Sequence, residues 1–246
     1  MKRFIIPSHS VSGDTVTITG DLFHHMARVL RLKKGVLLCL ADGKDREYKG
    51  TICKVGEESL IIKLEEIITA LTNEIGPKIT LFQGLPKGDK LDWIIQKCTE
   101  LGVDEIVPFV ATRSVSRPPA GRIKEKLERW RRIAAEAARQ SNRMTVPQVT
   151  LAADFSEACM QADHSVKLLL WEQEQPGTLR KLLAGSPSPE RIAVIVGPEG
   201  GLTNEEVASA LKCGFISVSL GKRIVRTETA GLAMLAILQF YWGDIG

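Results

Sequence analysis

Short hydrophobic runs organise the first 70 residues of the chain, and their residues are β-branched or alternate with polar ones. Five such runs occupy residues 4–6, 15–18, 36–40, 49–55 and 59–64. Glycines separate the runs, and this spacing of strands and turns predicts a small β-barrel. One helix interrupts the pattern over residues 22–30, with its apolar side chains on one side and Asp21 as the expected N-cap.

From residue 78 onward the pattern changes to an alternation of strands and helices. Four short apolar runs predict strands, at residues 79–82, 105–109, 167–171 and 192–196. Apart from Lys167, the last two are apolar throughout, which is typical of parallel strands that are covered on both faces. Helical spacing of apolar residues fills residues 89–101, where Asp89 is the expected cap, and residues 122–141.

These patterns divide the chain into a β-barrel at residues 1–70, a linker at 71–77 and an α/β domain with a parallel sheet at 78–246. The helical segment at residues 228–242 is apolar nearly all round. A helix of this kind is buried, either inside its own domain or against a second copy of the chain.

A glycine-rich loop follows the apolar run at residues 192–196. It reads Gly197-Pro198-Glu199-Gly200-Gly201, and Thr203 with Glu206 then forms a capping-box pattern that begins a helix. A strand, a tight loop and a capped helix form a ligand-binding edge in α/β proteins, although a plain structural turn explains the glycines equally well. The spacing matches neither the dinucleotide-binding nor the P-loop pattern. Because a carboxylate at a helix start repels phosphate, Glu199 favours a cationic or hydroxyl-rich ligand.

A second strand and loop follow at residues 217–231. Arg223 and Arg226 precede the apolar helix and could hold a nucleic-acid base or phosphate. The alternative is a pair of surface arginines beside a helix cap at Thr227.

Composition narrows the class of protein. The 246 residues contain 44% hydrophobic and 25% charged residues, as in ordinary globular proteins. No apolar run approaches the roughly 18 residues of a membrane span, and the N-terminus lacks a leader pattern, so a cytoplasmic protein is expected. The five cysteines are dispersed, which favours reduced core thiols and gives no metal-binding pattern.

The net charge of +4 is unevenly distributed. Residues 76–150 hold 14 lysines and arginines against 8 acidic residues, and ten of the basic residues lie between Arg113 and Arg143. Such a concentration indicates contact with a polyanion, whereas a solvated helix face with ion pairs is the alternative. On the helix of the barrel, Arg28 and Arg31 could touch RNA, or they could simply form its exposed polar face.

Taken together, the two loops identify a family. Gly197-Pro-Glu-Gly-Gly-Leu202 followed by Leu220-Gly-Lys-Arg-Ile-Val-Arg-Thr-Glu-Thr-Ala230 closely resembles the SPOUT class of RNA methyltransferases, and within it the 16S rRNA (uracil-N3)-methyltransferase family. Further stretches similar to that family lie at residues 25–32, 87–103, 112–115 and 138–143. Val225 departs mildly, since the family more often has leucine there.

The resemblance implies a PUA-like barrel for RNA, followed by an α/β domain tied in a trefoil knot. It also implies S-adenosylmethionine as the cofactor, a homodimer, and the 16S ribosomal RNA of the small subunit as the partner, with no metal and no membrane. The residues that it assigns to the cofactor are Leu170, Ile195, Gly197, Pro198, Glu199, Gly200, Leu220, Gly221, Ile224, Val225 and Thr227.

The chemistry of uracil methylation suggests roles for two further residues. Arg226 is the candidate for stabilising the uracil anion, because a guanidinium is always protonated. Glu228 or a water is the candidate base. The candidate RNA-binding residues are Arg28, Arg31, Lys87, Arg113, Arg139 and Arg143. Two other functions stay open: a methyltransferase of the same class that acts on tRNA or a ribose hydroxyl, and an RNA-binding module without activity.

Overall fold

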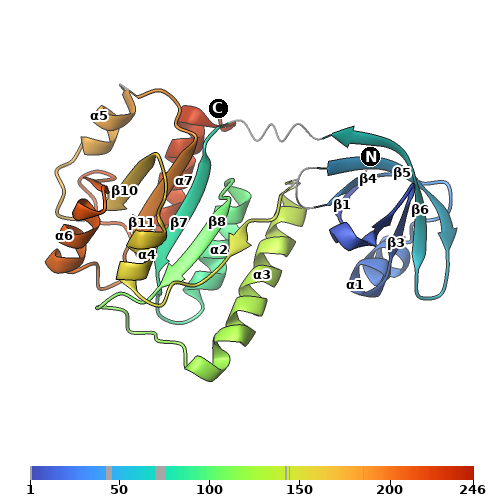
Figure 1. Ribbon diagram of the computed structural model, residues 1–246, viewed down its shortest axis with the longest axis horizontal. Coiled ribbons are helices and arrows are strands. Elements are labelled where there is room, and N and C mark those ends of the chain that lie inside the picture. The colour runs from blue at the N-terminus through green and yellow to red at the C-terminus, as the bar shows by residue number, and fades with distance from the viewer. Residues whose placement is uncertain (1, 43–45, 70–75, 142, 144, 185) are drawn as a thin grey trace. The chain divides into compact units, whose positions relative to one another are not determined.

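The computed structural model describes residues 2–42, 46–69, 76–141, 143, 145–184 and 186–246. The chain forms two compact units: Met1–Asn73 with Arg139–Val146, and Glu74–Ala138 with Pro147–Gly246 (Figure 1). Residues 71–75 of the expected linker lie outside the described residues. In the described part, no helix is both long and apolar enough to cross a lipid bilayer.

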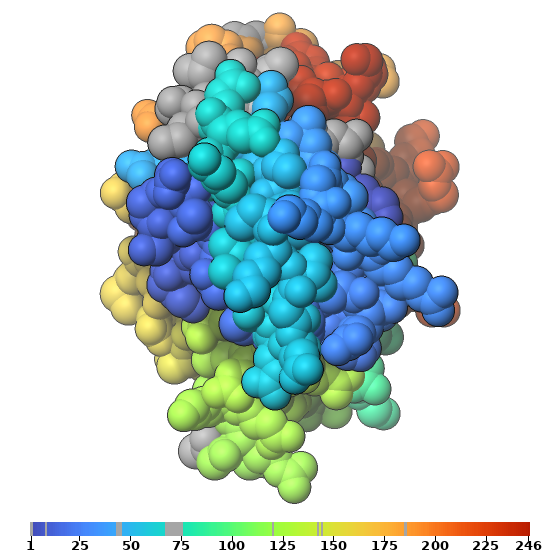
Figure 2. Space-filling view, turned by 90° about the vertical axis from the view of Figure 1, so that its right-hand side faces the viewer, coloured from blue at the N-terminus to red at the C-terminus, as the bar shows by residue number. Residues whose placement is uncertain are grey.

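The first unit is built on a mixed sheet with the strand order β1-β4-β5-β6-β3-β2. The strands are β1 (Lys2–Ile5), β2 (Val11–Ser12), β3 (Thr15–Ile18), β4 (Leu37–Ala41), β5 (Arg46–Val55) and β6 (Leu60–Thr69), and a 3-10 turn, η1 (Ser8–Ser10), precedes β2. Side chains from β1 and β3 to β6 meet in one core, for example Phe4, Ile18 and Ile62. The five predicted strands are therefore confirmed. Figure 2 shows this unit from outside, with the β5–β6 hairpin in light blue to cyan.

The helix of the first unit differs from the prediction. It starts as α1 (Gly20–Phe23) with Thr19 at the N-cap, so the assignment of Asp21 as the cap is wrong. It then widens into a π-helix, η2 (His24–Val29), and Arg31 ends it with a φ of 50°. The predicted apolar side still holds, because Phe23 and Met26 are buried in the core.

The second unit has a sheet in which every adjacent pair is parallel, with the order β12-β10-β11-β7-β8-β9. The strands are β7 (Lys78–Gly84), β8 (Glu105–Phe109), β9 (Gln148–Val149), β10 (Val166–Leu170), β11 (Arg191–Val196) and β12 (Ile216–Val218). The predicted α/β architecture is confirmed. Register pairs Val196 with Gln83 and Leu170 with Val218, so the carboxyl ends of these strands share one edge.

Helices cover both faces of this sheet (Figure 1). They are α2 (Lys90–Glu100), α3 (Ile123–Gln140), α4 (Phe155–Gln161), α5 (Thr178–Ala184), α6 (Asn204–Lys212) and α7 (Thr227–Trp242), with a 3-10 turn, η3 (Ala120–Arg122), before α3. On one face α4 and α6 share a core with Phe82 and Ile195. On the other, α7 packs on Leu81 at Gly231 and contacts α2.

The structure confirms the helices predicted at α2, α3, α6 and α7. Asp89 lies at the N-cap of α2 but makes no capping hydrogen bond with its side chain. The sequence pattern missed α4 and α5, which have seven residues each. Such short helices carry too few turns for a periodic apolar stripe to stand out.

His164 makes the unfolding free energy of the second unit sensitive to acid. Burial, helped by the nearby charges of Arg191 and Lys167, lowers the pKa of its imidazole to about 4. The unfolded chain binds a proton near pH 6.5 and the folded chain does not, so stability is lost as the pH falls from about 6.5 towards 4. We expect this residue to account for about 2–3 kcal/mol of that loss.

Urea unfolding of the wild type and of His164→Gln at pH 7.5, 5.5 and 4.5 measures this loss. The variant should be less stable at pH 7.5 and show a flatter decline. Parallel curves for the two proteins would contradict the assignment.

Candidate functional site

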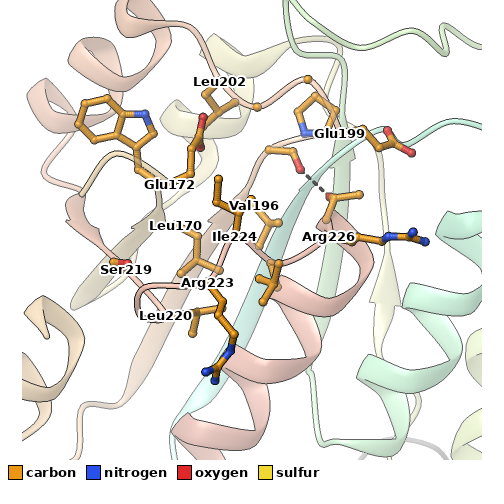
Figure 3. A pocket seen from close by; sticks show the side chains of 18 of the residues that line it. Leu170, Glu172, Val196, Glu199, Leu202, Ser219, Leu220, Arg223, Ile224 and Arg226 are labelled. Atoms are coloured by element: carbon orange, nitrogen blue, oxygen red, sulfur yellow. Dashed lines mark hydrogen bonds between the residues drawn. The ribbon is translucent and has the colours of Figure 1, made fainter. Parts of the chain in front are cut away.

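A cavity of about 510 Å³ opens at the carboxyl ends of β11, β10 and β12 (Figure 3). Three segments form most of its wall, at residues 170–172, 196–202 and 218–227, and Lys90 and Ala230 complete it. Pockets for small molecules range over roughly 300–1,000 Å³. Both the size and the position at this edge of a parallel sheet are those of a ligand site.

The first glycine loop approaches β7 so closely that Gly84 has no room for a side chain. A Cβ on Gly84 would lie 2.6 Å from the backbone nitrogen of Pro198. The predicted capping box after the loop is confirmed: Glu206 N donates to Thr203 Oγ1 at 3.2 Å, and Thr203 N donates to Glu206 Oε2 at 2.8 Å. The loop is thus held at its start by the close approach of β7 and at its end by the local capping box.

The Glu199 carboxylate is bound by the protein itself. It accepts hydrogen bonds from the backbone N–H of Lys87 at 3.1 Å and from Lys90 Nζ at 2.8 Å. Burial alone would raise the pKa of the Glu199 carboxyl, but these hydrogen bonds hold that pKa below its ordinary value. The hydrogen bond to Glu199 in turn raises the pKa of Lys90. In this arrangement Glu199 joins the loop to the start of α2.

Arg113 also contacts the first loop. Its Nη1 donates to the carbonyl oxygens of Gly200 at 3.1 Å and Leu202 at 3.4 Å. The adjacent Thr112 N–H donates to Glu206 at 2.8 Å. Arg113, a candidate RNA-binding residue, therefore stabilises the conformation of the cavity loop.

The second loop carries one apolar and one charged side. Ile224 is 85% exposed and lines the cavity with Leu220. The Arg226 side chain is 83% exposed and lies 4.0 Å from Glu228. Figure 3 shows Arg226 and Arg223 extending in different directions from the loop.

Glu228 lies at the first turn of α7, beside Lys90 and Arg226. Lys90 Nζ is 3.5 Å from its Oε2, and Arg226 Nη1 is 4.0 Å from its Oε1. Within the described residues, Oε2 is buried and accepts no hydrogen bond. The carboxylate is thus shared between Lys90 and Arg226, and its side chain, 16% exposed, can exchange a proton with a bound molecule through a water.

Several lining residues were not predicted from the sequence, and two of them stand out. Trp171 and Glu172 follow β10 and line the cavity, and Glu172 is labelled in Figure 3. A Cβ on Gly201, where φ is +68°, would lie 2.9 Å from Glu172 Oε1. The positive φ favours glycine at this position, and the Glu172 carboxylate beside it adds an acceptor for hydroxyl or amino groups.

The structure brings together nearly all of the residues that the resemblance assigned to a cofactor. Those that line the cavity are Leu170, Gly197, Pro198, Glu199, Gly200, Leu220, Gly221, Ile224, Val225 and Thr227. Ile195 does not line it, because its side chain is fully buried in the core below α4 and α6. Val196 lines the cavity instead, since successive side chains of a strand point to opposite faces.

The other candidate RNA-binding residues fall in both units. Arg28 and Arg31 are exposed, whereas Arg139 contacts His25 at 3.1 Å and Arg143 is buried. Lys87 is exposed beside the cavity loop that its backbone holds.

Metal-ligating and reactive groups are few in the part of the chain that the structure describes. No group of three or more His, Cys, Asp or Glu side chains there could hold a metal ion. The cysteines are free, and burial raises the pKa of Cys159 to about 12, so this thiol stays protonated.

Comparison with known proteins finds matches to family models, to relatives and to solved structures. Residues 73–239 match the family model of an RNA methyltransferase domain, and residues 18–65 match an RNA methyltransferase PUA domain. Ribosomal RNA small subunit methyltransferase E of Bacillus subtilis is 35% identical over 236 residues, which span 92% of this chain and 90% of that protein. The Synechocystis protein of the same name is 34% identical, spanning 95% of this chain and 76% of its own.

Among solved structures, ribosomal RNA small subunit methyltransferase E from Neisseria gonorrhoeae bound to S-adenosyl methionine aligns with a TM-score of 0.84. It is 33% identical, and 100% of both chains is covered. A Legionella pneumophila protein solved with the bound cofactor SAM aligns with a TM-score of 0.85 at 29% identity over 98% of each chain.

Proposed function

Because the chain belongs to the RNA methyltransferase family that includes ribosomal RNA small subunit methyltransferase E, we propose that it methylates N3 of a specific uridine in 16S ribosomal RNA. The family assignment makes the chain an S-adenosylmethionine-dependent rRNA methyltransferase. The base and the position on it are our inference. The observation that carries the inference is the exposed cation Arg226 in the wall of the cavity, 4.0 Å from the carboxylate of Glu228.

The residues of the cavity fit S-adenosylmethionine. Leu170, Val196 and Leu220 offer an apolar wall for an adenine ring, and Glu172 offers an acceptor for hydroxyl or amino groups. Only Lys90, Lys222, Arg223 and Arg226 are cationic in the lining, and Lys90 is already bound to Glu199. The carboxylate of Glu172 in the lining suits the hydroxyl and amino groups of this cofactor better than it suits a phosphate. When bound, S-adenosylmethionine supplies the electrophilic methyl group.

Arg226 and Glu228 provide the two functions that a uracil N3 nucleophile needs. N3 is a poor nucleophile until its proton leaves, and the negative charge then spreads to O2 and O4. The guanidinium of Arg226 can stabilise that charge because it stays protonated. The carboxylate of Glu228 can accept the N3 proton through a water.

We propose that the barrel at residues 1–70 and the basic residues Arg28, Arg31 and Lys87 hold the RNA, in the cytoplasm where ribosomes are made. Phosphate contacts of this kind position the RNA and do not read its sequence. Binding should then weaken steeply with salt. The trefoil knot that the resemblance implies is part of the same proposal, with the cavity loops as its crossing segments.

We also propose a homodimer that covers the outer side of α7. Phe240 is 69% exposed and Tyr241 44%, and Trp93 on the neighbouring α2 is 43% exposed. Exposed aromatic residues on an otherwise apolar helix are typical of an interface.

Phe240→Glu should therefore shift the chain from dimer to monomer in analytical ultracentrifugation, because it places a charge in the interface. Met160→Glu is the matched control, since Met160 is 72% exposed on α4 and should leave the dimer intact. A monomeric wild type, or a dimer that survives Phe240→Glu, would rule out this interface.

The proposed substrate is tested by transfer of labelled methyl from S-adenosylmethionine. The acceptors are naked 16S RNA, assembled small subunits and tRNA, each from cells that lack the enzyme. Label should enter 16S RNA, alone or in the subunit. Label in tRNA only would favour the alternative methyltransferase, and no transfer despite RNA binding would favour the binding module.

A further inference from the structure

A buried amide on β7 joins the two loops of the cavity. Gln83 is fully buried, and its Nε2 donates to Thr227 Oγ1 at 2.9 Å and to the carbonyl of Gly84 at 3.0 Å. Thr227 is 6% exposed, and its hydroxyl donates to the carbonyl of Gly197 at 2.6 Å. A continuous hydrogen-bonded chain thus runs from the sheet through the first turn of α7 to the glycine loop.

The direction of every bond in this chain is forced. Carbonyl oxygens only accept, so the nitrogen of the Gln83 amide must face Gly84 and its oxygen cannot. The amide nitrogen only donates, so Thr227 Oγ1 must accept from it. The single hydroxyl proton of Thr227 is therefore left for Gly197, which needs a donor.

The arrangement has a cost that packing alone does not explain. Oε1 of Gln83 is buried and accepts no hydrogen bond within the described residues. Burying an amide with an unsatisfied oxygen is unfavourable compared with an apolar side chain of similar size. Thr227 directly follows Arg226, so the same bonds also fix the backbone from which Arg226 extends.

We propose that Gln83 is a positioning residue for the cofactor cavity. By setting the direction of the Thr227 hydroxyl, it holds the carbonyl of Gly197 and the start of α7 in the geometry that binds S-adenosylmethionine. This role rests on the proposed function, since it assumes that the cavity holds this cofactor.

Gln83→Glu should reverse the direction of the hydrogen bonds that link residue 83, Thr227 and Gly197, and protonation of the new carboxylate at low pH should restore it. An ionised carboxylate can only accept, so the Thr227 proton turns towards it and Gly197 loses its donor. Burial raises the pKa of such a carboxyl, and the protonated form regains an O–H donor. Calorimetry should therefore find a dissociation constant for S-adenosylmethionine about tenfold above that of the wild type at pH 8.5, falling to within about threefold at pH 6.

Gln239 supplies a matched control at the other end of α7. It is 6% exposed, its Nε2 donates to the carbonyl of Gly102 at 3.3 Å, and its Oε1 is also buried without a hydrogen bond in the described part. Gln239→Glu introduces the same buried acid away from the loops. The ratio of its dissociation constant for S-adenosylmethionine to that of the wild type should stay near one at both pH values.

Gln83→Met serves as the uncharged second variant, with thermal melting to show that it folds. It should bind S-adenosylmethionine about tenfold more weakly at both pH values, with no recovery at low pH. Wild-type affinity in both Gln83 variants would overturn the role. The role would also be overturned if Gln83→Glu lost the same affinity at both pH values and Gln239→Glu lost as much. Such a result would indicate general damage to the core. A wild type that binds no S-adenosylmethionine would instead overturn the proposed function, and this role with it.

Discussion

Arg226→Ala is expected to lower the rate of methyl transfer by about 10²–10³-fold, because it removes the cation that faces the developing uracil anion. The Arg226 side chain is 83% exposed, so its loss should not disturb the fold. Affinity for S-adenosylmethionine, measured by calorimetry, should stay within about threefold of the wild type. The rate is measured by single-turnover transfer to the RNA, which separates chemistry from product release.

Arg223→Ala is the control for this experiment. Arg223 is an exposed arginine of the same loop whose side chain extends in another direction (Figure 3). It should lower the rate much less than Arg226→Ala does. Equal losses in the two variants would mean that the loop needs positive charge in general, and that Arg226 has no specific role.

Gly84→Ala is expected to weaken binding of S-adenosylmethionine by up to about 100-fold. The new Cβ would lie 2.6 Å from Pro198 Cδ and from Pro198 N, and 2.9 Å from the carbonyl carbon of Gly197. Two of these atoms belong to the backbone, so the glycine loop itself must move. Calorimetry measures the affinity, and thermal melting reports the accompanying loss of stability.

Gly121→Ala provides the comparison, because a Cβ there meets nothing within 4 Å. It should leave both the affinity and the melting temperature nearly unchanged. If Gly84→Ala bound the cofactor as well as Gly121→Ala does, the close approach of β7 to the loop would not matter for binding.

Much of the fold was predictable because its patterns are local. The capping box of Thr203 and Glu206, the glycine loop before it and the apolar runs of β10 and β11 are each set by neighbouring residues. The π-helix at His24–Val29 was not predictable, since its apolar side suits an α-helix equally well. Only the widened turn and the positive φ of Arg31 distinguish the two.

The site was predictable where its residues lie in the two loops, and much less where they come from elsewhere. Lys90 reaches Glu199 across 109 positions of sequence, and Gln83 reaches Thr227 across 144. No periodicity connects such pairs; the order of the parallel strands brings them together. The prediction for Ile195 was wrong for a different reason. A shift of one residue along a strand decides whether a side chain faces the cavity or the core, and Val196 faces the cavity.

The most direct test of the proposed function is to map the methylated nucleoside. Small-subunit RNA from cells without the enzyme is incubated with the chain and S-adenosylmethionine, digested, and analysed by mass spectrometry against standards of each methyluridine. The account predicts one added methyl group, on N3 of a single uridine, which disappears with Arg226→Ala. A methyl group on a ribose hydroxyl or on another base would contradict it.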